Sequence, residues 1–123
     1  HDALPIYLGK KSKPIVYVPD ADCSGKMKIS RLGGREENFA EWSEVYSEKG
    51  GKYNMTIFYS CDKNRKLEVS VNGTETVLKD LNSNKEVKSI TIPVTLQKGY
   101  NTVRMGNDFG WAPDIDRFTL SRQ

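Results

Sequence analysis

Histidine is almost absent from this chain of 123 residues, and cysteine is rare. The one histidine is His1, at the start of the sequence. Catalysis of the Ser-His-Asp or Cys-His type needs an imidazole within hydrogen-bond reach of the nucleophile, so that class of enzyme is excluded, as are histidine-ligated metal sites. Cys23 and Cys61 fit no zinc spacing, so they are either a disulfide of an exported protein or two free thiols.

Long apolar runs and a strong charge imbalance are also missing. No uninterrupted apolar stretch approaches the roughly 20 residues of a membrane helix, so no membrane span is predicted. Nineteen Lys and Arg residues stand against sixteen Asp and Glu, a net charge of +3, and the basic residues are scattered. Nucleic-acid binding is not expected, because it normally requires a clustered basic patch or stripe.

The length corresponds to one domain, too short for a typical catalytic domain together with an accessory one. Residues 1–13 combine the apolar run Leu4–Leu8 with the polar segment Gly9–Lys13, and we expect them to be a linker or the tail of a preceding catalytic domain. The folded module is expected over residues 14–123. The start at His without a leader favours a fragment of a longer polypeptide.

Apolar side chains recur with a period of two, which predicts strands that bury one face. Asn72-Gly73 supplies the positive φ angles of a type I′ turn, so strands 66–71 and 74–79 should form a hairpin. Pro93 cannot donate a ladder hydrogen bond, so its strand is expected at an edge or bulge. The predicted fold class is all-β, an antiparallel β-sandwich of the jelly-roll type. The alternating residues are Tyr53, Met55, Ile57, Tyr59, Leu67, Val69, Val71, Ile90, Ile92, Val94 and Leu96.

The loop between the last two expected strands gathers residue types that bind sugars. Trp111 would stack on the apolar face of a pyranose, unless its indole folds back over the core. Asn107 would give a donor and an acceptor to adjacent hydroxyls, or else form a turn by bonding its own backbone. Asp108, Asp114 and Asp116 add carboxylates to the same loop.

Two further residues are candidates for the sugar site. Arg65 can fork onto a carboxylate or two hydroxyls, although a loop arginine is commonly just a solvated charge. Trp42 is a candidate second aromatic platform for the sugar site, although a core position is favoured for it. It lies in segment 33–47, which alternates poorly and is expected to be a loop leading into a strand.

Asp116 opens the last expected strand in phase with Phe118 and Leu120. A carboxylate in phase with core residues must be paired or bound to a cation, and oxygen-rich sites favour calcium. The alternative is a salt bridge to Arg117 or Arg104.

Glycoside hydrolysis needs only two carboxylates about 5 to 10 Å apart, and the chain has sixteen acids. The loop acids, however, cluster closely, with Asp114 and Asp116 on roughly the same face of a strand. Such close pairs hold cations or cap turns more often than they act as acid and base. We therefore expect this domain to be non-catalytic.

Four blocks of the sequence have a distinctive order and spacing: Gly51–Tyr59, Arg65–Gly73, Leu96–Arg104 and Trp111–Arg117. Together they resemble family 35 and family 6 carbohydrate-binding modules. The likeness is greatest to the module that follows the catalytic domain in family 27 alpha-galactosidases, and it covers about residues 14–123. It implies a β-jelly-roll with a structural calcium and a sugar site in the loops at one end.

The resemblance also implies roles for single residues in the sugar site. Asn107 and Trp111 look like the family's ligand residues in the final loop. Arg65 is similar to an arginine that contacts acidic or hydroxyl-rich sugars in some members. The loop around Arg35 and Asn38 matches the other wall of the cleft.

For the calcium, Asp116 looks like the C-terminal ligand of the family. The N-terminal calcium motif usually holds two acids around a small residue. Here Asp20 fits the second acid, while Val18 replaces the first. Calcium at Asp20 and Asp116 is thus an expectation with one departure from the pattern.

The function expected from these features is that of a non-catalytic module that binds galactose-containing or related glycans. Its partners would be the carbohydrate and an attached alpha-galactosidase-like glycoside hydrolase, in a secreted, periplasmic or cell-surface protein. The alternative is a structural β-sandwich spacer packed on the catalytic domain, which would bury Trp111. A small glycosidase is the third alternative for the function of this chain. The pattern does not name the sugar.

Overall fold

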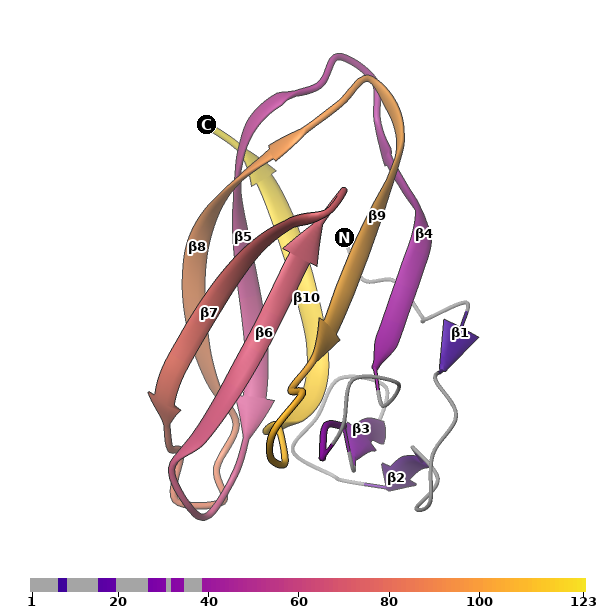
Figure 1. The fold of residues 1–123 in the computed structure, drawn as a ribbon. Helices are drawn as coiled ribbons and strands as arrows, with labels where there is room; N and C mark the ends of the chain where they lie inside the picture. Colours follow the sequence, from indigo (N-terminus) through magenta and orange to yellow (C-terminus); the bar gives the residue numbers. More distant parts are fainter. Residues whose placement is uncertain (1–6, 9–15, 20–26, 31, 35–38) are drawn as a thin grey trace.

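The computed structural model describes residues 7–8, 16–19, 27–30, 32–34 and 39–123. In these residues, ten strands form two five-stranded antiparallel sheets that pack face to face (Figure 1). One sheet has the order β1-β4-β9-β6-β7 and the other the order β2-β3-β10-β5-β8. The strands are β1 (Tyr7–Leu8), β2 (Val16–Pro19), β3 (Met27–Ser30), β4 (Ala40–Ser47), β5 (Gly51–Ser60), β6 (Arg65–Val71), β7 (Thr74–Leu81), β8 (Lys88–Leu96), β9 (Gly99–Gly106) and β10 (Asp114–Arg122).

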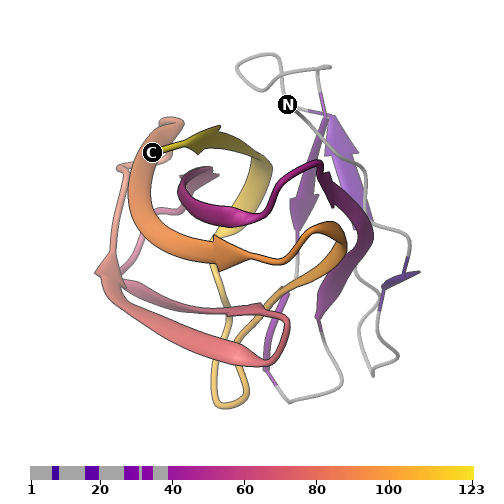
Figure 2. The ribbon, with the colours of Figure 1, turned by 90° about the horizontal axis from the view of Figure 1, so that it is seen from above.

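The predicted all-β sandwich is confirmed, and so is the hairpin of β6 and β7. Val71 pairs with Thr74, and both turn residues, Asn72 and Gly73, have positive φ angles of 49° and 89°. The side chain of Asn72 also accepts a hydrogen bond from the backbone nitrogen of Thr102 at 2.9 Å. The hairpin therefore follows from its turn chemistry and is tied to the neighbouring β9. It lies on the opposite side of the molecule from β2 and β3 (Figures 1 and 2).

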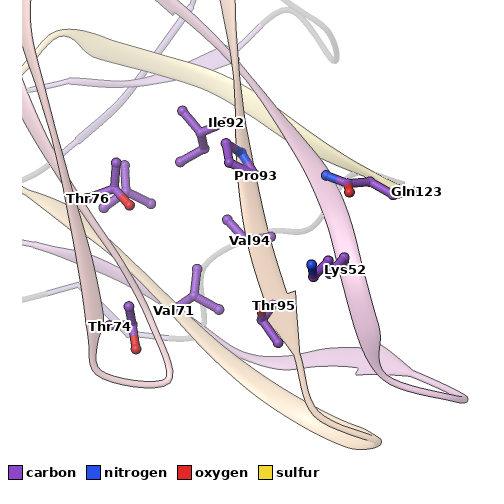
Figure 3. A pocket seen from close by; sticks show the side chains of 10 residues that line it. Lys52, Val71, Thr74, Thr76, Ile92, Pro93, Val94, Thr95 and Gln123 are labelled. Carbon is purple, nitrogen blue, oxygen red and sulfur yellow. The ribbon is translucent and has the colours of Figure 1, made fainter.

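Pro93 lies on an edge strand, as predicted. β8 is the last strand of its sheet, and Pro93 pairs with Asn54 of β5, its only neighbour in that sheet. On the same side of the sandwich, β7 is the last strand of the other sheet. A groove of about 470 Å³ is open there, with Val71, Ile92 and Val94 among its lining residues (Figure 3).

The short strand β1 lies within residues 1–13, the segment expected to be a linker or tail. Its two residues pair with the start of β4, Tyr7 with Glu41 and Leu8 with Ala40. The first sheet of the sandwich thus includes a piece of that segment. No described part of the chain forms a helix with the length and apolarity required to span a lipid bilayer.

Trp42 lies in the core, which corrects its expected place in the sugar site. Its side chain is 2% exposed, and its ring packs edge-to-face on Phe118 with centroids 5.0 Å apart. The pairing of β4 with β9 shifts between Trp42 and Val45, which marks a β-bulge or irregularity. Trp42 and Val45 are both buried although they are three residues apart, so the bulge hides the alternation of this strand.

A second irregularity, in β10, changes the phase of Asp116. Ile115 pairs with Tyr59, but the next paired residue is Arg117, so Asp116 is the extra residue of a bulge. Ile115 and Phe118 are both buried, whereas Asp116 is only half-buried. The expectation that Asp116 shares a face with Phe118 is therefore wrong, because the bulge resets the period of two.

Cys61 is a free thiol in the structure, while Cys23 lies outside the described residues. The Cys61 sulfur donates a hydrogen bond to the carbonyl of Leu81 at 3.1 Å, and burial raises the pKa of the thiol. Because the unfolded thiol loses its proton at a lower pH, Cys61 stabilises the fold fully only below the ordinary thiol pKa of about 8.5. This contribution is lost as the pH rises through the folded-state pKa.

We expect Cys61 of a Cys23→Ser variant to react with a thiolate-specific reagent at pH 8 several-fold more slowly when folded than in denaturant. The measurement is the absorbance time course with and without guanidinium. Equal rates in the two conditions would contradict the protected thiol. A wild-type Cys61 that cannot be alkylated in denaturant without a reductant would contradict the free thiol.

Candidate functional site

Several loops meet at one end of the sandwich, the end that carries most of the predicted site residues. The strand pairs fix this arrangement. Ser60 at the end of β5 pairs with Asp114 at the start of β10, and Met105 near the end of β9 pairs with Ala40. Loops 61–64 and 107–113 therefore lie at the same end, in the lower part of Figure 1.

Trp111 is held at this end by backbone contacts to residues 32–34. It forms an isolated antiparallel bridge with Gly33, and the amide of Gly34 donates to the carbonyl of Gly110 at 2.7 Å. The indole lies over Gly34, where an added Cβ would be 3.8 Å from two ring carbons. Its side chain is still 38% exposed. This exposure agrees with an aromatic platform and disagrees with the buried Trp111 that a spacer predicts.

Gly33 allows the two segments to approach each other so closely. Its φ is +95°, and a Cβ there would collide with the carbonyl oxygen of Gly110. A side chain at this position would therefore push loop 107–113 away and move Trp111. The position of the Trp111 ring is therefore fixed by the backbone contact between residues 32–34 and loop 107–113.

Asn107 organises the loop from inside, which differs from its expected contact with the sugar. The residue is 4% exposed. Its Nδ2 donates to the carbonyls of Lys66 at 3.0 Å and of Trp111 at 3.4 Å, and its Oδ1 accepts from the amide of Phe109 at 3.1 Å. Because both amide protons are used within the protein, Asn107 is a positioning residue for the loop.

We expect Asn107→Ala to lower the free energy of unfolding by about 1–3 kcal/mol, because buried carbonyls lose their donor. Sugar binding should weaken as well, since Trp111 loses one of its anchors. Urea denaturation and titration with a sugar ligand measure the two effects. The matched control is Asn64→Ala, at an exposed asparagine of loop 61–64, which should change stability by less than about 0.5 kcal/mol. Equal effects of the two substitutions would contradict this role.

Phe109 is an aromatic residue at the loop tip that the sequence analysis did not single out. Its side chain is 90% exposed, and Lys66 Nζ lies 5.5 Å from the ring centroid. Lys66 in turn pairs with Glu68 at 3.6 Å, and Glu68 accepts a hydrogen bond from the amide of Asp108 at 2.6 Å. The sequence offered one signal for this turn, because an Asn in a loop commonly bonds the backbone amide two residues on, which here is that of Phe109.

The other predicted sugar ligands have different positions. Asp108 is exposed and lines a polar groove of about 570 Å³ on the outer face of the first sheet. Arg65 begins β6 opposite Leu81, half-buried at the loop end, and its charge acts on the thiol of Cys61. Arg35 and Asn38 lie outside the described residues.

The described residues do not by themselves provide a calcium site. Among them, no group of three or more His, Cys, Asp or Glu side chains is placed to hold a metal ion. Asp114 accepts a hydrogen bond from the hydroxyl of Ser30 at 2.9 Å, and Asp116 is the bulge residue of β10. Asp20, the other expected ligand, lies outside the described part of the chain.

Comparison with known proteins gives matches among solved structures. No protein-family model and no curated protein matches the sequence. A family 35 carbohydrate-binding module from Clostridium thermocellum is 26% identical, with a TM-score of 0.85 over 94% of this chain and 90% of that one. A family 35 module from Paenibacillus barcinonensis is 19% identical, with a TM-score of 0.70 over 95% of this chain and 98% of that one.

A third similar structure belongs to an enzyme. An exo-beta-1,3-galactanase from Phanerochaete chrysosporium is 21% identical, with a TM-score of 0.78 over 94% of this chain. The chain spans only 28% of that protein, so the likeness is to one domain of it. The fold is thus that of a carbohydrate-binding module of the family 35 type, which also occurs within a glycoside hydrolase.

Proposed function

We propose that this chain is a non-catalytic carbohydrate-binding module that holds a sugar ring on Trp111. The observation that supports this most directly is the partly exposed indole, held by a backbone bridge at the loop end of a family 35-type sandwich. An aromatic face on a fixed loop provides an apolar platform for the C–H face of a pyranose. The ring is placed before the sugar arrives, so little ordering of the loop opposes binding.

Polar groups at the same end complete the recognition of the sugar in this proposal. The carboxylate of Asp108 accepts hydrogen bonds from hydroxyl groups, and the guanidinium of Arg65 donates them. A site with one stack and a few hydrogen bonds binds in roughly the micromolar to millimolar range. Such an affinity suits a module that keeps an attached enzyme close to a polymeric substrate with many identical sites.

Galactose-containing glycans are the proposed ligand class, with an alpha-galactosidase-like hydrolase as the proposed parent protein. The resemblance of the four sequence blocks supports both. The galactanase with a similar domain was determined with galactose, which supports the ligand class. A secreted, periplasmic or cell-surface location is part of the same proposal, because the protein would encounter polymeric glycans outside the cytoplasm.

A structural calcium held by Asp20 and Asp116 is also proposed, on the family resemblance. We expect calcium chloride to raise the melting temperature of the wild type above its value in EDTA, because a bound ion stabilises only the folded state. The shift should disappear in Asp116→Asn. Identical melting temperatures in calcium and in EDTA would contradict the proposed calcium site.

The experiment that tests the function is affinity electrophoresis of the purified chain through gels that contain galactan, arabinogalactan, polygalacturonate or xylan. Retardation in the galactose-containing gels is expected, followed by calorimetry with the matching oligosaccharides. Retardation only by another polysaccharide would contradict the galactose-containing ligand class, while still supporting a carbohydrate-binding module. Free migration in every gel would contradict sugar binding and favour the spacer.

A further inference from the structure

We propose that Phe109 forms a second sugar subsite next to Trp111, so that the site takes a chain of at least two sugar residues. This inference rests on the proposed function. It starts from the exposure of Phe109, a residue that is 90% exposed although the sandwich has an apolar core nearby. A single exposed apolar residue is common on protein surfaces, so exposure alone does not define a site.

The contacts around Phe109 distinguish it from a mobile loop tip. Its own amide donates to the buried Oδ1 of Asn107 at 3.1 Å. The amide of the preceding residue, Asp108, donates to Glu68 on β6 at 2.6 Å. The backbone is therefore fixed on the N-terminal side of the ring by two side chains of different elements.

Lys66 orients the ring itself. Its ammonium group lies 5.5 Å from the ring centroid and pairs with Glu68 at 3.6 Å. A cation over an aromatic ring is attracted by the ring quadrupole. In this proposal the sugar stacks on the ring face opposite Lys66.

Asn107 couples this platform to Trp111. The same amide group that accepts from Phe109 donates to the carbonyl of Trp111 at 3.4 Å. One residue, Gly110, separates Phe109 from Trp111 in the sequence, which limits their backbone separation to about 7 Å. This separation is of the order of the distance between neighbouring rings in a glycan chain. In this proposal the two aromatic side chains therefore contact consecutive sugar residues.

The consequence is a preference for oligosaccharides over the monosaccharide. With both platforms present, the second stack should improve affinity about tenfold. Without Phe109, an oligosaccharide should bind little better than a single sugar.

The test is calorimetric titration of the wild type, Phe109→Ala and Trp111→Ala with galactose and with β-1,3-galactotriose. We expect Phe109→Ala to bind the trisaccharide about tenfold more weakly than the wild type and galactose within twofold of it. Phe109→Trp should restore trisaccharide affinity. Tyr100→Ala, which removes an aromatic that is 62% exposed near the start of β9, is the matched control and should bind both ligands like the wild type.

The outcomes separate this inference from the proposed function. A wild type that binds galactotriose no more tightly than galactose overturns the second subsite but keeps the module. The same holds if Phe109→Ala leaves trisaccharide affinity unchanged, or weakens both ligands equally. A wild type that binds neither probe overturns both the subsite and the galactose-binding function.

Discussion

Replacing Trp111 with alanine is expected to weaken sugar binding at least tenfold and leave the fold intact. The indole supplies the stacking face, and the loss of a favourable ring contact together with its buried area exceeds about 1.4 kcal/mol, which is a factor of ten in affinity. The fold should survive because the side chain is partly exposed and its backbone makes the bridge to Gly33. Titration calorimetry and circular dichroism measure the two properties.

The control for this prediction is Tyr100→Ala, an aromatic truncation away from loop 107–113. It should leave the affinity within twofold of the wild type. If Trp111→Ala binds as tightly as the wild type, the aromatic platform is wrong. If the variant unfolds, Trp111 is mainly a structural residue, as the spacer reading requires.

Replacing Trp42 with alanine is expected to lower stability rather than act on the sugar site, with a loss of about 3–5 kcal/mol in the free energy of unfolding. Trp42 is 2% exposed and packs edge-to-face on Phe118 at the centre of the sandwich. Its removal leaves a large cavity between the two sheets. Since domains are commonly stable by only 5–15 kcal/mol, the variant should be partly unfolded at moderate temperature.

Urea denaturation followed by circular dichroism measures this loss, and Trp42→Phe is the conservative control. The phenylalanine keeps an aromatic ring in the core and should lose much less stability. Substitution of Trp111 should therefore weaken sugar binding, whereas substitution of Trp42 should lower stability. A loss below about 1 kcal/mol for Trp42→Ala would contradict the core assignment.

The parts of the fold that the sequence predicted well depend on local chemistry. The β6–β7 hairpin follows from Asn72-Gly73, because both turn residues need positive φ. The edge position of β8 follows from Pro93, because a proline cannot donate within a ladder. The alternation in β5, β6 and β8 shows directly which faces are buried.

The errors fall where the chain departs from regular pairing. In β4 the register shift between Trp42 and Val45 breaks the period of two, so the alternation left both the core and the sugar site open for Trp42. In β10 the extra residue Asp116 resets the phase for the same reason. A β-bulge depends on the partner strand as well as on its own residues, and the partner is not visible in a local pattern.

The sequence grouped several candidate residues in loop 107–113, but it did not show which way their side chains point. Trp111 is exposed, as an aromatic between small and rigid neighbours in a loop was expected to be. For Asn107 a sugar contact and a turn through its own backbone were both predicted. The structure shows the turn, with Oδ1 accepting from the amide of Phe109 and Nδ2 directed inward to the carbonyls of Lys66 and Trp111. Whether the Asn107 side chain points into the protein or toward solvent depends on contacts between segments that are distant in the sequence. The same contacts also position Phe109.

The central claim is that Trp111 contacts the sugar, and fluorescence of the Trp42→Phe variant tests it most directly. The chain has two tryptophans, so Trp111 is the only one left in this variant. We expect acrylamide to quench the emission of the free protein readily. A bound galacto-oligosaccharide should shift the emission in a saturable way and protect it from the quencher. An emission that is already blue-shifted and protected in the free protein, and that no sugar changes, would contradict the claim.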